Sequence, residues 1–126
     1  MKKLYKLLAC FKSVQYRGVN TQMNQDTKVV DWLTEIAREE PALTSLVLFG
    51  SRARKDHHDK SDYDIAVTFS DESSFPKWAQ YVREHIPTLC GIDIVLINKG
   101  STDPSLVNKI RNEGVTLYEK NGKNEG

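Results

Sequence analysis

Two aspartates stand one residue apart at the start of an apolar segment, and this pairing limits the possible folds more than any other feature of the chain. Residues 62–69 read DYDIAVTF. Every second side chain of an extended strand points to the same face, so Asp62 and Asp64 share one face. The opposite face is apolar and can enter a core, because it carries Tyr63, Ile65, Val67 and Phe69. We therefore predict a strand over 63–69 with one buried face and an acidic start.

The segments around this strand alternate between helical and extended patterns. Apolar residues fall at helical spacing over 27–39, where Asp26 is a plausible N-cap and Pro41 ends the helix. Further predicted helices cover 75–86 and 104–113, and further predicted strands cover 45–49, 91–98 and 115–119. This order, α-β-turn-β-α-β-α-β, predicts an α/β (α+β) domain in which helices flank a small mixed sheet.

Two details of the predicted helices bear on packing. The helix over 75–86 carries four large apolar residues at helical spacing, which are Phe75, Trp78, Tyr81 and Val82. They fit either a partner surface or a core, and the spacing favours the core. Gly114 follows the helix over 104–113 and is its expected C′ residue.

Length and charge bound the number of domains and the partners. The chain has 126 residues, which suits one domain. We predict a basic, poorly ordered extension over 1–22, a folded domain over 23–119 and a disordered tail over 120–126. The first 20 residues carry a charge of +5 and the remainder carries −4. The body therefore lacks the broad basic field that would hold duplex nucleic acid.

Cysteine usage and hydropathy indicate a cytoplasmic protein without a membrane partner. Two cysteines, Cys10 and Cys90, argue for a reducing compartment and against a disulfide framework. No stretch approaches the ~20 apolar residues of a membrane-spanning helix. The LLAC sequence at 7–10 matches a lipoprotein cleavage box, but the apolar run around it is shorter than the roughly 7–15 residues of a signal sequence.

A Gly-Ser turn follows the predicted strand over 45–49. A strand that stops at Gly50 and turns into a short helix leaves backbone N–H groups pointing outward, where they can bind phosphate. Ser51 adds a hydroxyl donor. Many turns read Gly-Ser, so this signal alone also fits a plain strand-to-helix turn.

Three acids form the second signal. Asp62 and Asp64 repel each other unless a cation lies between them, and Mg²⁺ is a cation that binds through few carboxylates. A solvated acidic strand end would also explain the pair. Asp93 interrupts the apolar segment 91–98, which is hydrophobic enough to predict a central strand, where a carboxylate needs a function. An edge position or an arginine partner would also explain Asp93.

Together these motifs resemble the nucleotidyltransferase superfamily typified by DNA polymerase beta, and more narrowly its minimal nucleotidyltransferase (MNT) group. The resemblance covers residues 27–119 and rests on Phe49-Gly50-Ser51, Asp62-Tyr63-Asp64-Ile65 and Asp93 in GIDIVLI. It implies a polymerase-beta-like nucleotidyltransferase core over 23–119. One position departs from the pattern: members often carry glycine where this chain has Lys55. The following His57-His58-Asp59 segment fits a solvated loop rather than a zinc site.

The resemblance implies transfer of AMP, or another NMP, from ATP or another NTP to a hydroxyl. The implied catalytic residues, which would also hold two Mg²⁺ ions, are Asp62, Asp64 and Asp93. The implied nucleotide ligands are Gly50, Ser51, Arg52 and Arg54. Among them, Gly50 and Ser51 would hold the β- and γ-phosphates, and the arginines would neutralise triphosphate charge.

The resemblance also implies an acceptor. The minimal members of the superfamily occur as antitoxins beside a small helical HEPN-type toxin and add AMP to a tyrosine of that partner. The implied assembly is a hetero-oligomer with the toxin. Two alternatives remain open: an antitoxin that masks its partner without catalysis, and a transferase that modifies a small molecule such as an aminoglycoside.

Overall fold

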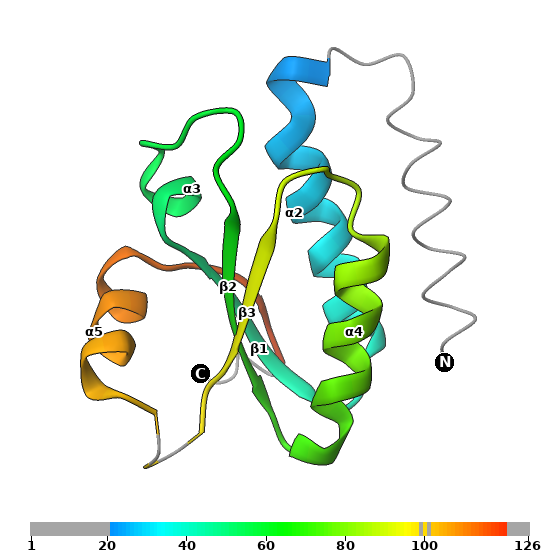
Figure 1. The fold of residues 1–126 in the computed structure, drawn as a ribbon. Coiled ribbons are helices and arrows are strands. Elements are labelled where there is room, and N and C mark those ends of the chain that lie inside the picture. Colours follow the sequence, from blue (N-terminus) through cyan, green and yellow to red (C-terminus); the bar gives the residue numbers. More distant parts are fainter. Residues whose placement is uncertain (1–20, 99, 101, 121–126) are drawn as a thin grey trace.

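The computed structural model describes residues 21–98, 100 and 102–120, in which helices cover both faces of a mixed four-stranded sheet (Figure 1). The helices are α2 (Thr21–Glu39), α3 (Ser51–Arg54), α4 (Phe75–His85) and α5 (Pro104–Glu113), with a 3₁₀ turn η1 (Glu72–Ser74). The strands are β1 (Leu43–Phe49), β2 (Tyr63–Phe69), β3 (Ile92–Leu96) and β4 (Val115–Glu119). The predicted fold class and order of elements are confirmed.

The start of α2 differs most from the prediction. The helix begins at Thr21 instead of Thr27, so Asp26 lies inside it, and the prediction that Asp26 is the N-cap is wrong. The carboxylate of Asp26 instead accepts hydrogen bonds from Arg52 and Tyr63, which belong to other elements. Most of the predicted leader, 1–20, and of the predicted tail, 121–126, lies outside the described residues.

The sheet brings the acidic segments together. Its strand order is β3-β2-β1-β4, with β2 and β3 parallel and β1 antiparallel to both β2 and β4. The register places Asp64 of β2 opposite Phe49 on one side and opposite Asp93 of β3 on the other. Because β2 and β3 run parallel, Asp62, Asp64 and Asp93 meet at the same end of the sheet.

Strand β3 lies at an edge of the described sheet, so the prediction of a central strand is wrong. Its apolar character has another cause. Ile92, Ile94 and Leu96 alternate along the strand and pack against the core from the edge. Asp93 lies between them and is exposed, so a carboxylate there costs little desolvation.

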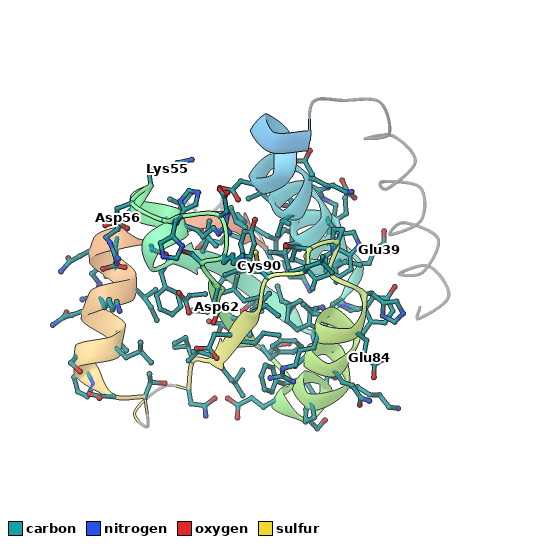
Figure 2. The ribbon with its side chains drawn as sticks, turned by 45° about the horizontal axis from the view of Figure 1, so that its top comes forward. Glu39, Lys55, Asp56, Asp62, Glu84 and Cys90 are labelled. Atoms are coloured by element: carbon teal, nitrogen blue, oxygen red, sulfur yellow. The ribbon has the colours of Figure 1, made fainter. Side chains whose placement is uncertain are left out.

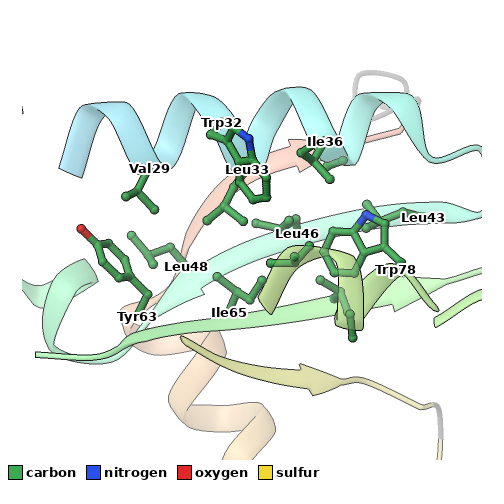
Figure 3. Packing of buried hydrophobic residues seen from close by; sticks show 14 of the residues in the cluster. Val29, Trp32, Leu33, Ile36, Leu43, Leu46, Leu48, Tyr63, Ile65 and Trp78 are labelled. Carbon is green, nitrogen blue, oxygen red and sulfur yellow. The ribbon is translucent and has the colours of Figure 1, made fainter. Parts of the chain in front are cut away.

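The core lies between the sheet and the helices α2 and α4 (Figure 3). In β2 the predicted alternation is confirmed, since Tyr63, Ile65 and Val67 are completely buried. Helix α4 buries Trp78 and Val82, which confirms core packing for its aromatic side. Among the described residues, no helix combines the length and apolar character needed to cross a bilayer. This packing fixes β2 and leaves its acidic end on the opposite face.

Candidate active site

The turn at Gly50 requires glycine for two reasons. Its backbone has φ 78° and ψ −161°, a conformation that residues other than glycine rarely adopt. A Cβ at this position would also collide with Oδ2 of Asp64. Beyond the turn, the N–H groups of Ala53 and Arg54 donate to the Gly50 carbonyl at 3.0 Å and start α3. The Gly50 backbone is therefore in direct contact with one of the predicted metal ligands.

The three aspartates share one face but have different surroundings. Burial raises the pKa of the Asp64 carboxyl, and the negative charges of Asp93 and, less strongly, Asp62 raise it further. The cations Lys109 and Arg54 act in the opposite direction. The negative charges that surround Asp64 therefore outweigh the two cations.

The donor set fits Mg²⁺, which prefers carboxylate oxygens together with water and phosphate. Asp62 points toward β3, since its Oδ1 lies 2.7 Å from where a Cβ of Gly91 would be, whereas Asp64 lies against Gly50. In this conformation the described residues include no group of three or more His, Cys, Asp or Glu side chains placed to hold one ion. Asp62, Asp64 and Asp93 are thus close enough for their charges to interact, but their side chains do not point at one common position for an ion.

The side chain of Arg52 does not lie with the three aspartates. Its side chain is only 4% exposed, and its guanidinium lies 4.3 Å from the centre of the Tyr63 ring. Nη1 donates to Asp26 at 2.6 Å, and Nε and Nη2 donate to the carbonyl of Ser61 at 3.2 and 2.9 Å. Nη2 also donates to the carbonyl of Asp59 at 3.1 Å. Arg52 thus clamps the loop that leads into Asp62.

Asp26 completes this buried cluster. Besides Arg52, it accepts a hydrogen bond from the Tyr63 hydroxyl at 2.6 Å and lies 3.2 Å from Nε2 of His57. His57 is therefore only partly exposed, whereas His58 and Asp59 are exposed, so the predicted solvated loop is confirmed except at His57. A sequence signal for Asp26 existed, because it precedes Val29 and Leu33 at helical spacing and so lies on the inward side of α2.

Arg54 lies on the opposite side of α3, toward the aspartates. Its Nη1 donates to Oε1 of Glu113 at 2.8 Å, and its Nε donates to Asp56 at 3.0 Å. The same Oε1 of Glu113 accepts the Gly50 N–H at 2.9 Å. Sequence reasoning did not identify Glu113, which ends α5 far along the chain from the Gly-Ser turn.

Lys55 ends α3 in a left-handed conformation, with φ 72° and ψ 21°. This is the position where the related pattern often has glycine, the residue that adopts positive φ without strain. Lys55 and Asp56 point outward from the turn after α3, as Figure 2 shows. Lys55 in place of glycine therefore affects the backbone of this turn and not the positions of the aspartates.

A Gly-Ser turn against a strand carboxylate, on a mixed sheet with helices on both faces, is the arrangement expected of a nucleotidyltransferase. The family model described as "Polymerase beta, Nucleotidyltransferase" matches residues 32–123. The chain belongs to this family and is a nucleotidyltransferase.

Two curated relatives from Methanocaldococcus jannaschii carry the provisional name protein adenylyltransferase. One is 34% identical over 77 residues, which cover 60% of this chain and 76% of the relative. The other is 31% identical over 75 residues, with the same coverage of both chains.

Solved structures share the fold. A chain of a toxin–antitoxin complex with AMP-PNP is 24% identical, with a TM-score of 0.59 over 76% of this chain and 77% of that one. A chain of the complex of a tri-AMPylated HEPN toxin from Shewanella oneidensis with MNT antitoxin is 22% identical. Its TM-score is 0.53 over 77% of this chain and 75% of that one.

Proposed function

We propose that this nucleotidyltransferase is Mg²⁺-dependent and transfers AMP from ATP to a tyrosine hydroxyl of a HEPN-type toxin, with release of pyrophosphate, and so acts as an antitoxin in the cytoplasm. The observation that carries the chemistry is the row formed by Gly50, Asp64 and Asp93. In this row the turn at Gly50, the Asp64 carboxylate and a third acid lie side by side across three neighbouring segments, as binding of a phosphate next to a metal would require.

Each residue has a distinct role in this proposal. Asp62 and Asp64 would hold the metal, and Mg²⁺, as one or two ions, would stabilise the charge that develops on the α-phosphate and on the departing pyrophosphate. Asp93 is exposed at the sheet edge, where an acceptor hydroxyl can approach and give up its proton. Ser51 and the first N–H groups of α3 contact the triphosphate, and Arg54 neutralises part of its charge.

The predicted nucleotide-binding role of Arg52 finds no support in its contacts. All the hydrogen bonds of its side chain go to Asp26, Asp59, Ser61 and Cys90, on the side of α3 that faces α2. We therefore assign Arg52 to the support of the loop before Asp62, and only Arg54 to the nucleotide.

The acceptor proposal has two kinds of support. The provisional name of both curated relatives gives a protein as the acceptor. Among the proteins that share the fold is a complex of an MNT antitoxin with a tri-AMPylated HEPN toxin. The exposed position of Asp93 agrees with a macromolecular acceptor, since a bulky tyrosine-bearing surface can reach an edge strand.

The test combines the purified chain with Mg²⁺, ATP labelled at the α-phosphate, and lysate of the source organism. The matched control is the Asp62→Asn/Asp64→Asn double variant. We expect one labelled protein band with the active chain and no labelled band with the control or with EDTA. Capture of a partner without any label would favour the masking antitoxin, and label on an added aminoglycoside without a partner would favour the small-molecule enzyme.

A further inference from the structure

Glu113 makes contacts that the proposed roles above do not explain. It is the last residue of α5 and its side chain is 20% exposed. One oxygen, Oε1, accepts both the Gly50 N–H at 2.9 Å and Nη1 of Arg54 at 2.8 Å. A single carboxylate thus joins the Gly50 turn to Arg54.

Close packing of the next residue, Gly114, fixes the position of Glu113. A Cβ on Gly114 would collide with the carbonyl of Ile110 and would lie 2.6 Å from Cγ1 of Val47. Gly114 has φ −73°, so glycine is needed here for close approach and not for a left-handed turn. The tight contact fixes the end of α5 against β1, directly beside the turn that β1 leads into.

Arg54 would compete with the metal if it were not held. It carries a permanent positive charge close enough to Asp64 to lower the pKa of that carboxyl. Its side chain is 41% exposed and long enough to reorient. Nη1 of Arg54 and the Gly50 N–H share Oε1 of Glu113, and Gly50 lies against Asp64, so a guanidinium released by Glu113 could turn toward Asp64. An ion pair there would occupy oxygens that the metal needs.

We propose that Glu113 is a positioning residue that holds Arg54 away from Asp64, so that the aspartates stay available to a divalent cation and the guanidinium stays available to the nucleotide. Asp56 assists on the solvent side through its contact with Nε of Arg54. This inference rests on the proposed function, because it presupposes that Asp64 binds a metal.

The test measures binding of Mn²⁺ alone to the full chain, by electron paramagnetic resonance of the free ion and without nucleotide. Mn²⁺ suits a carboxylate site and replaces Mg²⁺ as a spectroscopic probe. Glu113→Gln should weaken Mn²⁺ binding about fivefold, since released Arg54 competes for Asp64. Glu119→Gln is the matched control, because Glu119 is exposed on β4 and its replacement changes the net charge equally.

A double-mutant cycle separates this mechanism from a general loss of negative charge. If Glu113 acts through Arg54, Glu113→Gln has no effect on Mn²⁺ affinity in an Arg54→Gln background. A loss that persists there, or a Glu113→Gln variant that matches Glu119→Gln, overturns the proposal. Glu113→Asp offers a second variant, since it keeps the charge but shortens the reach, and we expect it to weaken Mn²⁺ binding as well.

Failure of the proposed function would look different. In that case the unsubstituted chain would bind Mn²⁺ no better than Asp64→Asn, and the metal site itself would be refuted. Thermal unfolding of every variant, without metal, shows whether a lost affinity reflects a lost fold.

Discussion

Arg52 and Arg54 are separated by one residue on the same short helix, yet they lie in opposite surroundings. Arg52 is 4% exposed and is bonded to Asp26 and to the carbonyl of Ser61. Arg54 is 41% exposed and pairs with Asp56 and Glu113 beside the aspartates. At 3.6 residues per turn, residues two apart lie on nearly opposite sides of a helix. One arginine therefore supports the site from behind while the other faces it.

The comparison explains why equal residue types in one motif have unequal roles. The motif shows two arginines after Gly-Ser but not which way each one points. The direction of Arg52 is fixed by Asp26, which the sequence places 26 positions away. The buried cluster of Asp26, Arg52 and Tyr63 should therefore control stability, and the open cluster of Arg54, Asp56 and Glu113 should control function.

The sharpest test of this division replaces each arginine by alanine. Arg52→Ala leaves Asp26 and the carbonyl of Ser61 without their donor, and we expect it to lower the free energy of unfolding by about 3 kcal/mol. Arg54→Ala should leave the free energy of unfolding nearly unchanged, because exposed ion pairs contribute little. Urea unfolding of both variants measures the difference. Equal losses in the free energy of unfolding would show that the two arginines contribute alike to stability.

Tyr63→Phe tests the buried cluster more gently. It removes only the hydroxyl that donates to Asp26 at 2.6 Å and keeps the ring against which Arg52 packs. We expect a loss of about 1 kcal/mol, the usual contribution of a hydrogen bond. Tyr118→Phe, in β4, is the control and should change the free energy of unfolding less. A neutral Tyr63→Phe would mean that the remaining partners of Asp26, Arg52 and His57, satisfy its carboxylate without the hydroxyl.

Asp64→Asn, next to the open cluster, should raise the free energy of unfolding instead of lowering it. Burial and the charge of Asp93 raise the pKa of Asp64 in the folded state. A raised pKa favours the fold while the group is protonated, and this contribution is lost as the pH rises through the raised value. At pH 7 the ionised carboxylate therefore destabilises the metal-free protein. Asp64→Asn should relieve this cost while it abolishes transfer.

The expected gain is small, below about 1 kcal/mol, because Asp64 is partly exposed and solvent screens its charge. Thermal unfolding in EDTA at several pH values measures it. The advantage of Asp64→Asn should shrink as the pH falls into the ordinary range of aspartate. An advantage that is independent of pH would assign the effect to something other than charge.

Local pattern predicted the parts of this molecule that local forces determine. The alternation in β2 predicted its two faces, and helical spacing predicted α5 and the buried side of α4. The contacts that could not be predicted join distant segments: Gly50 and Glu113 are 63 positions apart, and β3 takes its edge position from the topology of the whole sheet. Hydrophobicity alone does not distinguish a strand packed on one face from a central one.

Lys55 lies in the chain between the two clusters. Of the replacements considered, Lys55→Gly should change the free energy of unfolding least. It carries the chain from Arg54 into the loop that Arg52 clamps, and it does so with φ 72°. Lys55→Gly removes the strain of a side chain in the left-handed region but also loosens the unfolded chain. The two effects oppose each other, and we expect a net gain of up to about 0.5 kcal/mol in the free energy of unfolding.

Lys60→Gly provides the contrast for this last prediction. Lys60 lies in the same loop and is also exposed, but Lys55 is the only non-glycine residue with positive φ in the described part of the chain. Lys60→Gly should therefore lower the free energy of unfolding slightly, since its only effect is to increase the conformational freedom of the unfolded chain. Urea unfolding of the two variants side by side decides the matter: equal changes would mean that the turn after α3 bears no strain, and that glycine at this position serves the approach of a ligand instead.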